Sequence, residues 1–304
     1  EVIAYTITNE RLRASSIEEA VSAAMDRIKG AYSLVIMSPQ KLIAVRDPHG
    51  FRPLCIGRLG DGWVFASESC ALDAVGANFL RDIEPGEVLV IDSAGMHSHR
   101  IAGRCKPAAC IFEYVYFSRP DSILDGCSVY ETRMAAGRIL AENYPVEADI
   151  VSGVPDSAIV AARGYSQVSG IPYVEALEKN RYVGRTFIQP DQKMREDSVS
   201  VKMNPLRANI QGKRLVLIDD SIVRGTTSRR IVRMLKEAGA KEVHLRICSP
   251  VIRHPCHLGI DMQSYSQLIG ANKTEREICE YIGADSLKYL TIDQLTESRK
   301  AGKI

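Results

Sequence analysis

The first hundred residues combine one amphipathic helix with several short apolar runs. Apolar residues recur at helical spacing from Ile17 to Ile28, behind a Ser16-Ile-Glu-Glu19 segment with the spacing of a capping box, and Gly30 ends the pattern. Short strands are predicted over residues 31–37, 42–45, 63–66 and 88–92, with turn-forming Pro, Gly and Asp residues between them. This order predicts a largely antiparallel sheet that carries a helix.

The pattern changes after Lys106 and Pro107, where helical and strand-like segments begin to alternate. Helices are predicted over residues 132–143, 157–169 and 227–238, and strands over residues 149–154, 173–176, 214–218 and 242–248. Such alternation is typical of a parallel sheet with helices on both faces. We therefore expect an α/β protein with two domains, residues 1–107 and residues 108–304.

Composition and charge narrow the classes of function. Of the 304 residues, 45% are hydrophobic and 25% are charged, and 39 basic residues against 37 acidic ones leave a net charge of +2. A balance near zero gives no general attraction to nucleic acid or to an anionic membrane, so we expect neither as a partner. No apolar stretch is long enough to span a bilayer, and the eight scattered cysteines favour a reducing cytoplasm over a disulfide framework.

The segment with the clearest chemistry is Arg214-Leu-Val-Leu-Ile-Asp-Asp-Ser-Ile-Val-Arg-Gly-Thr-Thr-Ser228. A buried strand is predicted to end at the acid pair Asp219 and Asp220, and a loop with Gly225 and several hydroxyl side chains leads into a helix. Ligands of an open parallel sheet bind beyond the carboxyl ends of its strands, and a helix N-terminus offers free N–H groups to an anion. The segment therefore predicts a phosphate-binding loop beside acids that hold sugar hydroxyls or Mg²⁺. Its spacing is neither a Walker A motif nor a dinucleotide fingerprint.

This segment closely resembles the phosphoribosyl-pyrophosphate (PRPP) signature of type I phosphoribosyltransferases. Further segments resemble the glutamine PRPP amidotransferase family, and together they cover essentially the whole chain. They are Phe112-Glu-Tyr-Val-Tyr-Phe-Ser-Arg-Pro-Asp-Ser122, Gly153-Val-Pro-Asp-Ser157, Lys179-Asn-Arg-Tyr-Val-Gly-Arg-Thr-Phe-Ile-Gln-Pro190, Arg46-Asp-Pro-His-Gly-Phe-Arg-Pro-Leu54 and Ala66-Ser-Glu-Ser69. The resemblance implies part of an N-terminal-nucleophile glutaminase domain with an antiparallel sheet, followed by a type I phosphoribosyltransferase domain with a parallel sheet.

The same resemblance implies the first step of purine synthesis, which is a pentosyl transfer. Glutamine is hydrolysed in one domain of this family, and the ammonia displaces pyrophosphate from C1 of PRPP in the other to give 5-phosphoribosylamine. A homo-oligomer is implied as well. Residues 110–122 are rich in aromatic side chains, which fits a core strand at a domain interface and, by the resemblance, an apolar path for neutral NH₃.

Site residues follow from the resemblance position by position. Asp219 and Asp220 are expected to meet the ribose hydroxyls and, with Ser157, to hold Mg²⁺. The 5′-phosphate is expected on the loop and first helical turn, which comprise Ser221, Ile222, Val223, Arg224, Gly225, Thr226, Thr227 and Ser228. A flexible loop over residues 179–190 is expected to close over PRPP, and its functional residues are Lys179, Arg181, Tyr182, Gly184 and Arg185.

The glutaminase half departs from the family pattern. The nucleophile of such enzymes is a cysteine at the mature N-terminus, activated by its own α-amine. This chain starts at Glu1, and none of its eight cysteines matches that position. We therefore assign no glutaminase catalytic residue, and we expect a fragment, truncated at both ends, that uses ammonia alone.

Two cysteines match cofactor-binding positions of this family. Many family members hold a [4Fe–4S] cluster on four cysteines, and Cys110 and Cys256 match two of those positions. The other two positions fall beyond Ile304, so the resemblance implies a cluster in the full-length protein. A zinc site on His254, Cys256 and His257 is the local alternative, although its spacing is poor for a tetrahedral site.

Two other functions stay open at this point. A salvage phosphoribosyltransferase acting on a purine or pyrimidine base would leave the first hundred residues without a purpose. A non-catalytic PRPP-binding regulator would need a DNA-binding module, and the sequence shows no sign of one.

Overall fold

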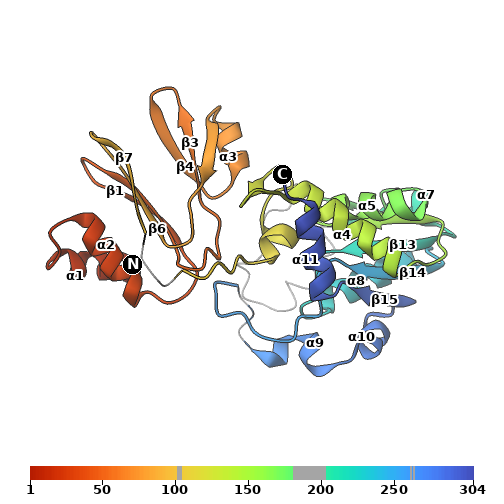
Figure 1. Cartoon of the computed structure of the whole chain (residues 1–304). Helices are drawn as coiled ribbons and strands as arrows, with labels where there is room; N and C mark the ends of the chain where they lie inside the picture. The colour runs from red at the N-terminus through yellow and green to blue at the C-terminus, as the bar shows by residue number, and fades with distance from the viewer. Residues whose placement is uncertain (101–104, 181–202, 261, 263) are drawn as a thin grey trace. The chain divides into compact units, whose positions relative to one another are not determined.

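The computed structural model describes residues 1–100, 105–180, 203–260, 262 and 264–304. The chain divides into two compact units (Figure 1). Unit 1 comprises Glu1–Glu113, Asp121–Gly126 and His257–Ile260, and unit 2 comprises Tyr114–Pro120, Cys127–Cys256 and Asp261–Ile304.

The main sheet of unit 1 is antiparallel throughout. Its strands lie in the order β1 (Ser33–Met37), β2 (Leu42–Arg46), β6 (Glu87–Asp92) and β7 (Gly95–Arg100). Helix α2 (Ile17–Arg27) packs Val21 and Met25 into a core with Ile43 and Val88, and α1 (Val2–Arg11) packs on α2. Ser16 caps α2 by accepting a hydrogen bond from the Glu19 N–H at 3.2 Å, so the predicted start of this helix is confirmed.

A second antiparallel sheet in unit 1 has the strand order β4 (Gly62–Ala66), β3 (Cys55–Leu59) and β5 (Asn78–Asp82), with α3 (Ser69–Ala74) beside it. It shares a core with the main sheet, in which Ile56 and Trp63 join Ala44 and Leu89. The sequence did not predict β3, because Gly57 interrupts its apolar pattern. The structure explains that glycine, since the register of β3 and β5 shifts there and a Cβ atom would lie 2.8 Å from the Asn78 carbonyl oxygen.

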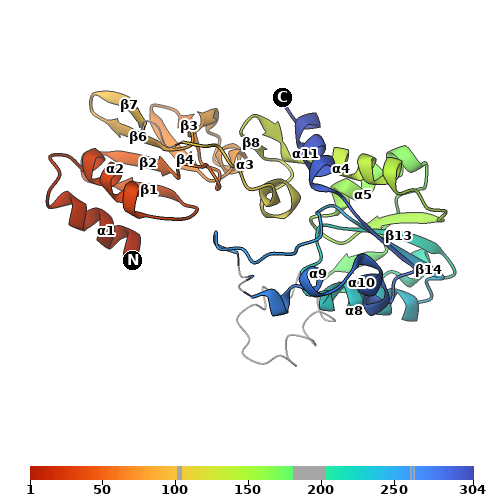
Figure 2. The same cartoon turned by 60° about the horizontal axis from the view of Figure 1, so that its bottom comes forward.

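Unit 2 is built on a parallel sheet. The strands follow the order β10 (Ile150–Gly153), β13 (Arg214–Asp219), β14 (Glu242–Ile247) and β15 (Ser286–Tyr289). Helices α4 (Val129–Asn143) and α5 (Ile159–Ser169) lie on one side of the sheet, and α8 (Thr226–Glu237) and α10 (Glu275–Ile282) on the other (Figure 2). This arrangement confirms the predicted α/β architecture, with helices on both faces.

Two glycines let α4 and α5 approach each other closely. A Cβ atom on Gly137 of α4 would lie 1.8 Å from the Ala161 carbonyl oxygen, and one on Gly164 of α5 would lie 2.1 Å from the Met134 carbonyl oxygen. Because real Cβ atoms never come so near to a backbone oxygen, only glycine permits this crossing. The crossing therefore fixes α4 and α5 against each other. The chain between these two helices includes the candidate site residue Ser157.

The strand predicted over residues 173–176 is wrong. Only Tyr173 forms a bridge, to Val151, and the Ala176 N–H donates to the Ser152 hydroxyl and not to a strand partner. The remaining elements are short or lie near the C-terminus. They are the π-helix η1 (Glu113–Phe117), β8 (Ile123–Leu124), β9 (Cys127–Ser128), β11 (Leu177–Lys179), β12 (Met203–Pro205), α7 (Arg207–Ile210), η2 (Tyr265–Gln267), α9 (Ile269–Asn272) and α11 (Ile292–Ala301).

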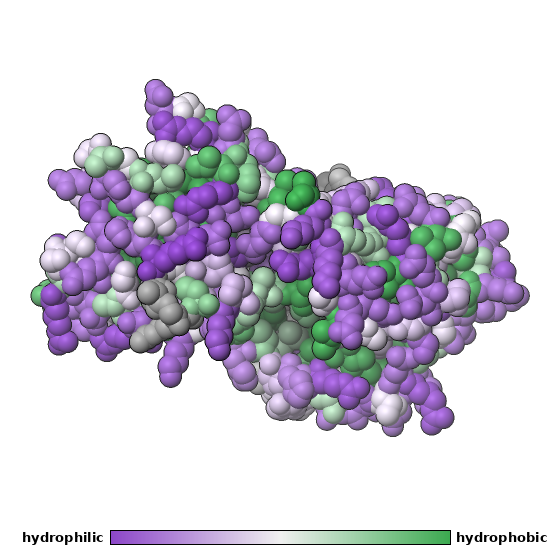
Figure 3. Space-filling view, in the orientation of Figure 1, coloured by the Kyte–Doolittle hydropathy of each residue, from purple (hydrophilic) through white to green (hydrophobic). Residues whose placement is uncertain are grey.

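The surface is largely polar on the face drawn in Figure 3, where hydrophobic residues gather in small separate patches. In the described part of the chain, no helix is long and apolar enough to cross a membrane.

Candidate active site

The acid pair lies at the carboxyl end of the second strand of the parallel sheet. Asp219 is the last residue of β13 and is only 7% exposed. Its carboxylate accepts a hydrogen bond from the Asp220 N–H at 2.9 Å, and the Asp220 carboxylate accepts one from the Ser221 hydroxyl at 2.7 Å. These bonds hold both carboxylates in fixed orientations at the sheet edge where α/β proteins bind ligands.

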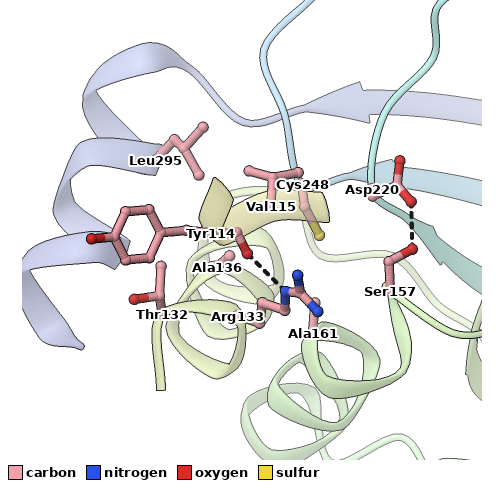
Figure 4. A pocket seen from close by; sticks show the side chains of 10 residues that line it. All are labelled: Tyr114, Val115, Thr132, Arg133, Ala136, Ser157, Ala161, Asp220, Cys248 and Leu295. Carbon is pink, nitrogen blue, oxygen red and sulfur yellow. Dashed lines mark hydrogen bonds between the residues drawn. The ribbon is translucent and has the colours of Figure 1, made fainter. Parts of the chain in front are cut away.

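Ser157 approaches this pair from the loop that follows the neighbouring strand β10. Its hydroxyl donates to Asp220 Oδ2 at 2.5 Å (Figure 4). Strands β10 and β13 are parallel neighbours in which Gly153 pairs with Ile218, so the loops that follow them emerge at the same edge. The structure thus brings together the three residues that the sequence analysis assigned to Mg²⁺.

The surroundings of the pair oppose its negative charge. Burial is the largest cause that raises the pKa of Asp219 and of Asp220, and the charge of Asp220 raises the pKa of Asp219 further. Hydrogen bonds from Ser157 and Ser221, and the nearby charge of Arg133, act in the opposite direction on the pKa of Asp220. Two desolvated carboxylates side by side gain from a bound cation, because it relieves their repulsion.

Magnesium fits this donor set. The described residues include no group of three or more His, Cys, Asp and Glu side chains that could enclose a metal ion. Mg²⁺ does not need such a cage, since it keeps several waters and takes substrate phosphate oxygens beside one or two carboxylates. Asp219 and Asp220, with the Ser157 hydroxyl beside them, match that mode of binding.

The loop after the acid pair ends in an uncapped helix N-terminus. Gly225 has a φ of +75°, and a Cβ atom there would lie 2.8 Å from Ile269 Cδ1, so both conformation and space favour glycine. No side chain in the described structure caps α8. The N–H groups of Thr226, Thr227 and Ser228 belong to the first turn and have no partner within the helix. Together with the helix dipole they form a site for an anion such as phosphate.

The middle residues of this loop contact neighbouring parts of the protein. Ile222 is 3% exposed and belongs to the core, and the Val223 carbonyl oxygen accepts a hydrogen bond from the Ile269 N–H at 2.9 Å. Arg224 directs its guanidinium to Gln267, at 2.7 Å. The predicted phosphate loop is therefore hydrogen-bonded to η2 and α9.

One residue of the predicted flexible loop can be placed. Lys179 ends β11 and forms an ion pair with Asp156, the residue before Ser157. The contact brings the start of the loop close to the acid pair. Arg181, Tyr182, Gly184 and Arg185 lie outside the described residues.

The structure adds two residues that the sequence analysis did not assign, Arg133 of α4 and Cys248, the residue after β14. Both line a small pocket beside the acid pair (Figure 4). The complete lining is Tyr114, Val115, Thr132, Arg133, Ala136, Ser157, Ala161, Asp220, Cys248 and Leu295. A charged residue on the apolar face of the helix predicted over residues 132–143 was the one signal that could have identified Arg133.

The cysteines of the predicted cluster lie in different units. Cys110 belongs to unit 1 and Cys256 to unit 2. His254 Nδ1 lies 3.3 Å from the Tyr265 hydroxyl. Among the residues with described positions, no group of three or more His, Cys, Asp and Glu side chains that could hold a metal ion forms around His254.

Comparisons with known proteins agree on the family. The sequence matches the phosphoribosyl transferase domain over residues 123–254 and the glutamine amidotransferase domain over residues 5–74. It is 52% identical to an amidophosphoribosyltransferase of Archaeoglobus fulgidus over 303 residues, which cover 99% of this chain and 66% of that protein. The Bacillus subtilis relative is 50% identical over 295 residues, which cover 97% of this chain and 62% of the relative.

A solved structure shows the same fold. The B. subtilis glutamine PRPP amidotransferase in complex with ADP and GMP superposes with a TM-score of 0.89 at 49% identity, over 98% of this chain and 65% of that one. The chain thus spans somewhat less than two thirds of the length of these relatives. The predicted order of a glutaminase part with antiparallel sheets before a phosphoribosyltransferase part with a parallel sheet is confirmed. The chain belongs to the amidophosphoribosyltransferase family.

Proposed function

We propose that this chain carries the phosphoribosyl-transfer site of an amidophosphoribosyltransferase. The complete reaction converts PRPP, glutamine and water to 5-phosphoribosylamine, glutamate and pyrophosphate, the first step of purine biosynthesis. The observation that carries the proposal is the hydrogen bond between Ser157 and Asp220. Asp220 lies in the same loop that leads to the uncapped start of α8. It supplies sugar- and metal-binding oxygens next to an anion site. Residues 1–107 form the glutaminase part in this proposal, and residues 108–304 form the phosphoribosyltransferase domain.

The residues at this edge divide the substrate between them. Asp219 and Asp220 accept hydrogen bonds from the ribose hydroxyls, and the main chain from Ser221 to Ser228 binds the 5′-phosphate. As the C1–O bond to pyrophosphate breaks, positive charge develops on the sugar, and the two carboxylates stabilise it. Ammonia forms the C1–N bond with its lone pair, pyrophosphate leaves with the electrons of the C1–O bond, and a proton passes from nitrogen to solvent. The acid pair and Ser157 would hold Mg²⁺, which would neutralise charge on the leaving pyrophosphate.

Further parts of the proposal rest on motifs. Lys179, Arg181, Tyr182, Gly184 and Arg185 close over PRPP and exclude water, which the charges of this segment and the Lys179–Asp156 ion pair support. Cys110 and Cys256 are cluster ligands in the full-length protein, which their match to the family motif supports. The thin spread of the eight cysteines along the sequence supports a reducing, cytoplasmic location, and the homo-oligomer stays a prediction. Family membership disfavours a salvage enzyme and a non-catalytic regulator.

Calorimetric titration with PRPP tests the site. In the presence of Mg²⁺ we expect wild-type protein to bind PRPP, and we expect the double variant Asp219→Asn/Asp220→Asn to lose that binding. Burial already disfavours the two charges, so the variant should melt no lower than wild type. Glu237→Gln, an exposed carboxylate of α8, is the matched control and should bind normally. Equal PRPP affinity of the double variant and the control would reject the assignment.

A further inference from the structure

Arg133 is a buried cation that holds a neighbouring segment by its main chain. Its side chain is 5% exposed, and a guanidinium keeps its charge in folded proteins. Nε donates to the Tyr114 carbonyl oxygen at 2.7 Å, and Nη2 donates to the Ser118 carbonyl oxygen at 2.8 Å. The two bonds fasten the beginning and the end of η1 to α4.

The aromatic ring of Tyr114 in this segment contacts a different element. Tyr114 is 1% exposed, and the guanidinium of Arg299 in α11 lies 5.1 Å from its ring centroid. The ring therefore packs against α11 while the main chain of η1 bonds to α4. Removing the bonds to Arg133 would loosen the main chain of η1 at these two points without removing the packing of the ring.

Segment η1 also forms one wall of the pocket beside the acid pair. Tyr114 and Val115 line the pocket with Arg133, across from the hydrogen-bonded Ser157 and Asp220 (Figure 4). About 10 Å³ is open to the centre of a water-sized molecule, which is room for one such molecule. The position of η1 thus sets how much solvent can stand beside the residues proposed to bind PRPP.

We propose that Arg133 is a positioning residue that limits hydrolysis of PRPP: by holding η1, it keeps this pocket to the size of one small molecule and limits the access of water to the sugar. The inference rests on the proposed function, because water competes with ammonia only if PRPP binds at the acid pair. Attack by ammonia forms a C1–N bond, whereas attack by water forms a C1–O bond, yields ribose 5-phosphate and releases a proton. Pyrophosphate leaves with the same electron pair in both reactions.

The two reactions can be separated by measuring pyrophosphate release from PRPP and Mg²⁺ with and without ammonia. We compare wild type, Arg133→Met, Arg133→Lys and the control Arg138→Met. Arg138 lies on the same helix, is 40% exposed in its side chain and pairs with Glu131. In Arg133→Met the ratio of ammonia-independent to ammonia-dependent release should rise about tenfold, the size of effect expected from two lost hydrogen bonds. Arg133→Lys retains the charge but reaches one carbonyl oxygen, so its ratio should lie in between.

Each outcome has a distinct meaning. If wild type releases no pyrophosphate with ammonia, the proposed function fails and this inference with it. If wild type is active and both Arg133 variants keep the ratio of Arg138→Met, the inference alone is overturned. Should Arg133→Met fail to fold, Arg133→Lys decides: an intermediate ratio supports the positioning role, and an unchanged ratio rejects it.

Discussion

Asp82, at the end of β5, shows how a single buried carboxyl group can oppose folding. Its neighbour Arg46 is 2% exposed and gives all five of its N–H donors to other groups. Those acceptors are both oxygens of the Asp125 carboxylate and the carbonyl oxygens of Gly50, Arg52 and Ile83. Burial, followed by the charge of Asp125, raises the pKa of Asp82 to about 6, although the charge of Arg46 opposes the shift.

This shift predicts a pH-dependent gain from Asp82→Asn. A raised pKa means that the folded state prefers the protonated form, so the contribution of Asp82 to stability is present below about pH 4 and is lost as the pH rises through about 6. Asparagine cannot ionise, and it keeps the oxygen that accepts from the Asp125 N–H. Above about pH 6, we expect the free energy of unfolding of the variant to exceed that of wild type by about 1–3 kcal/mol. Below about pH 4, we expect the two proteins to be equally stable.

Denaturant unfolding at the two pH values measures the effect. Asp61→Asn, in the exposed turn before β4, is the control and should change little at either pH. An equal gain from Asp82→Asn at both pH values would show that ionisation is not its cause.

Pairs of elements depend on a few positions where no side chain fits. At the crossing of α4 and α5, helix propensity alone would favour Ala over Gly by about 1 kcal/mol. The Cβ atom of Gly164→Ala would instead lie 2.1 Å from the Met134 carbonyl oxygen, and that of Gly137→Ala would lie 1.8 Å from the Ala161 carbonyl oxygen. The helices must separate, so we expect each variant to lose about 2–4 kcal/mol of stability.

Thermal unfolding of the two variants checks this crossing. Gln167→Ala, at an exposed position of α5, should keep or slightly raise the melting temperature because it changes propensity alone. Since α4 carries Arg133 and the loop before α5 carries Ser157, PRPP affinity should fall with stability in both glycine variants. A variant that melts like wild type would mean that the helices can shift at little cost.

Prediction from the sequence succeeds where an element is periodic and locally bounded. Strand β13, helix α8 and the site residues Asp219, Asp220 and Gly225 all lie in one continuous segment, so their pattern can be recognised without knowledge of the fold. Strand β3 and the irregular segment after Tyr173 depend on partners elsewhere, namely β5 and the Ser152 hydroxyl. Arg133 could not be assigned for the same reason, since its role appears only when α4 packs beside η1.

Across the whole chain, the family motifs are those of a glutaminase and of a phosphoribosyltransferase, and the structure divides into two compact units. The site in unit 2 needs only PRPP, a divalent cation and a nitrogen nucleophile in the proposed reaction. Glutamine use needs in addition an acyl-enzyme step on a cysteine nucleophile. The two demands can therefore be tested independently of each other.

We expect the 304 residues to form phosphoribosylamine from PRPP with ammonia as the nitrogen donor. Ammonia requires no acylation, and its rate should increase with pH as the fraction of neutral NH₃ grows, because the protonated form has no lone pair to donate. Glutamine requires in addition a cysteine nucleophile with a free α-amine, so it serves as the comparison donor.

The measurement is pyrophosphate release from a sample with a cooperative melt, with each nitrogen donor in turn. Asp219→Asn/Asp220→Asn serves as the inactive reference, because any release that it shows is not catalysed at the acid pair. Release with glutamine as the sole donor would mean that a residue of this sequence performs the acyl transfer. Absence of release with ammonia, from a folded sample that binds PRPP, would mean that the acid pair and the α8 N-terminus bind the substrate without being sufficient to transfer its sugar.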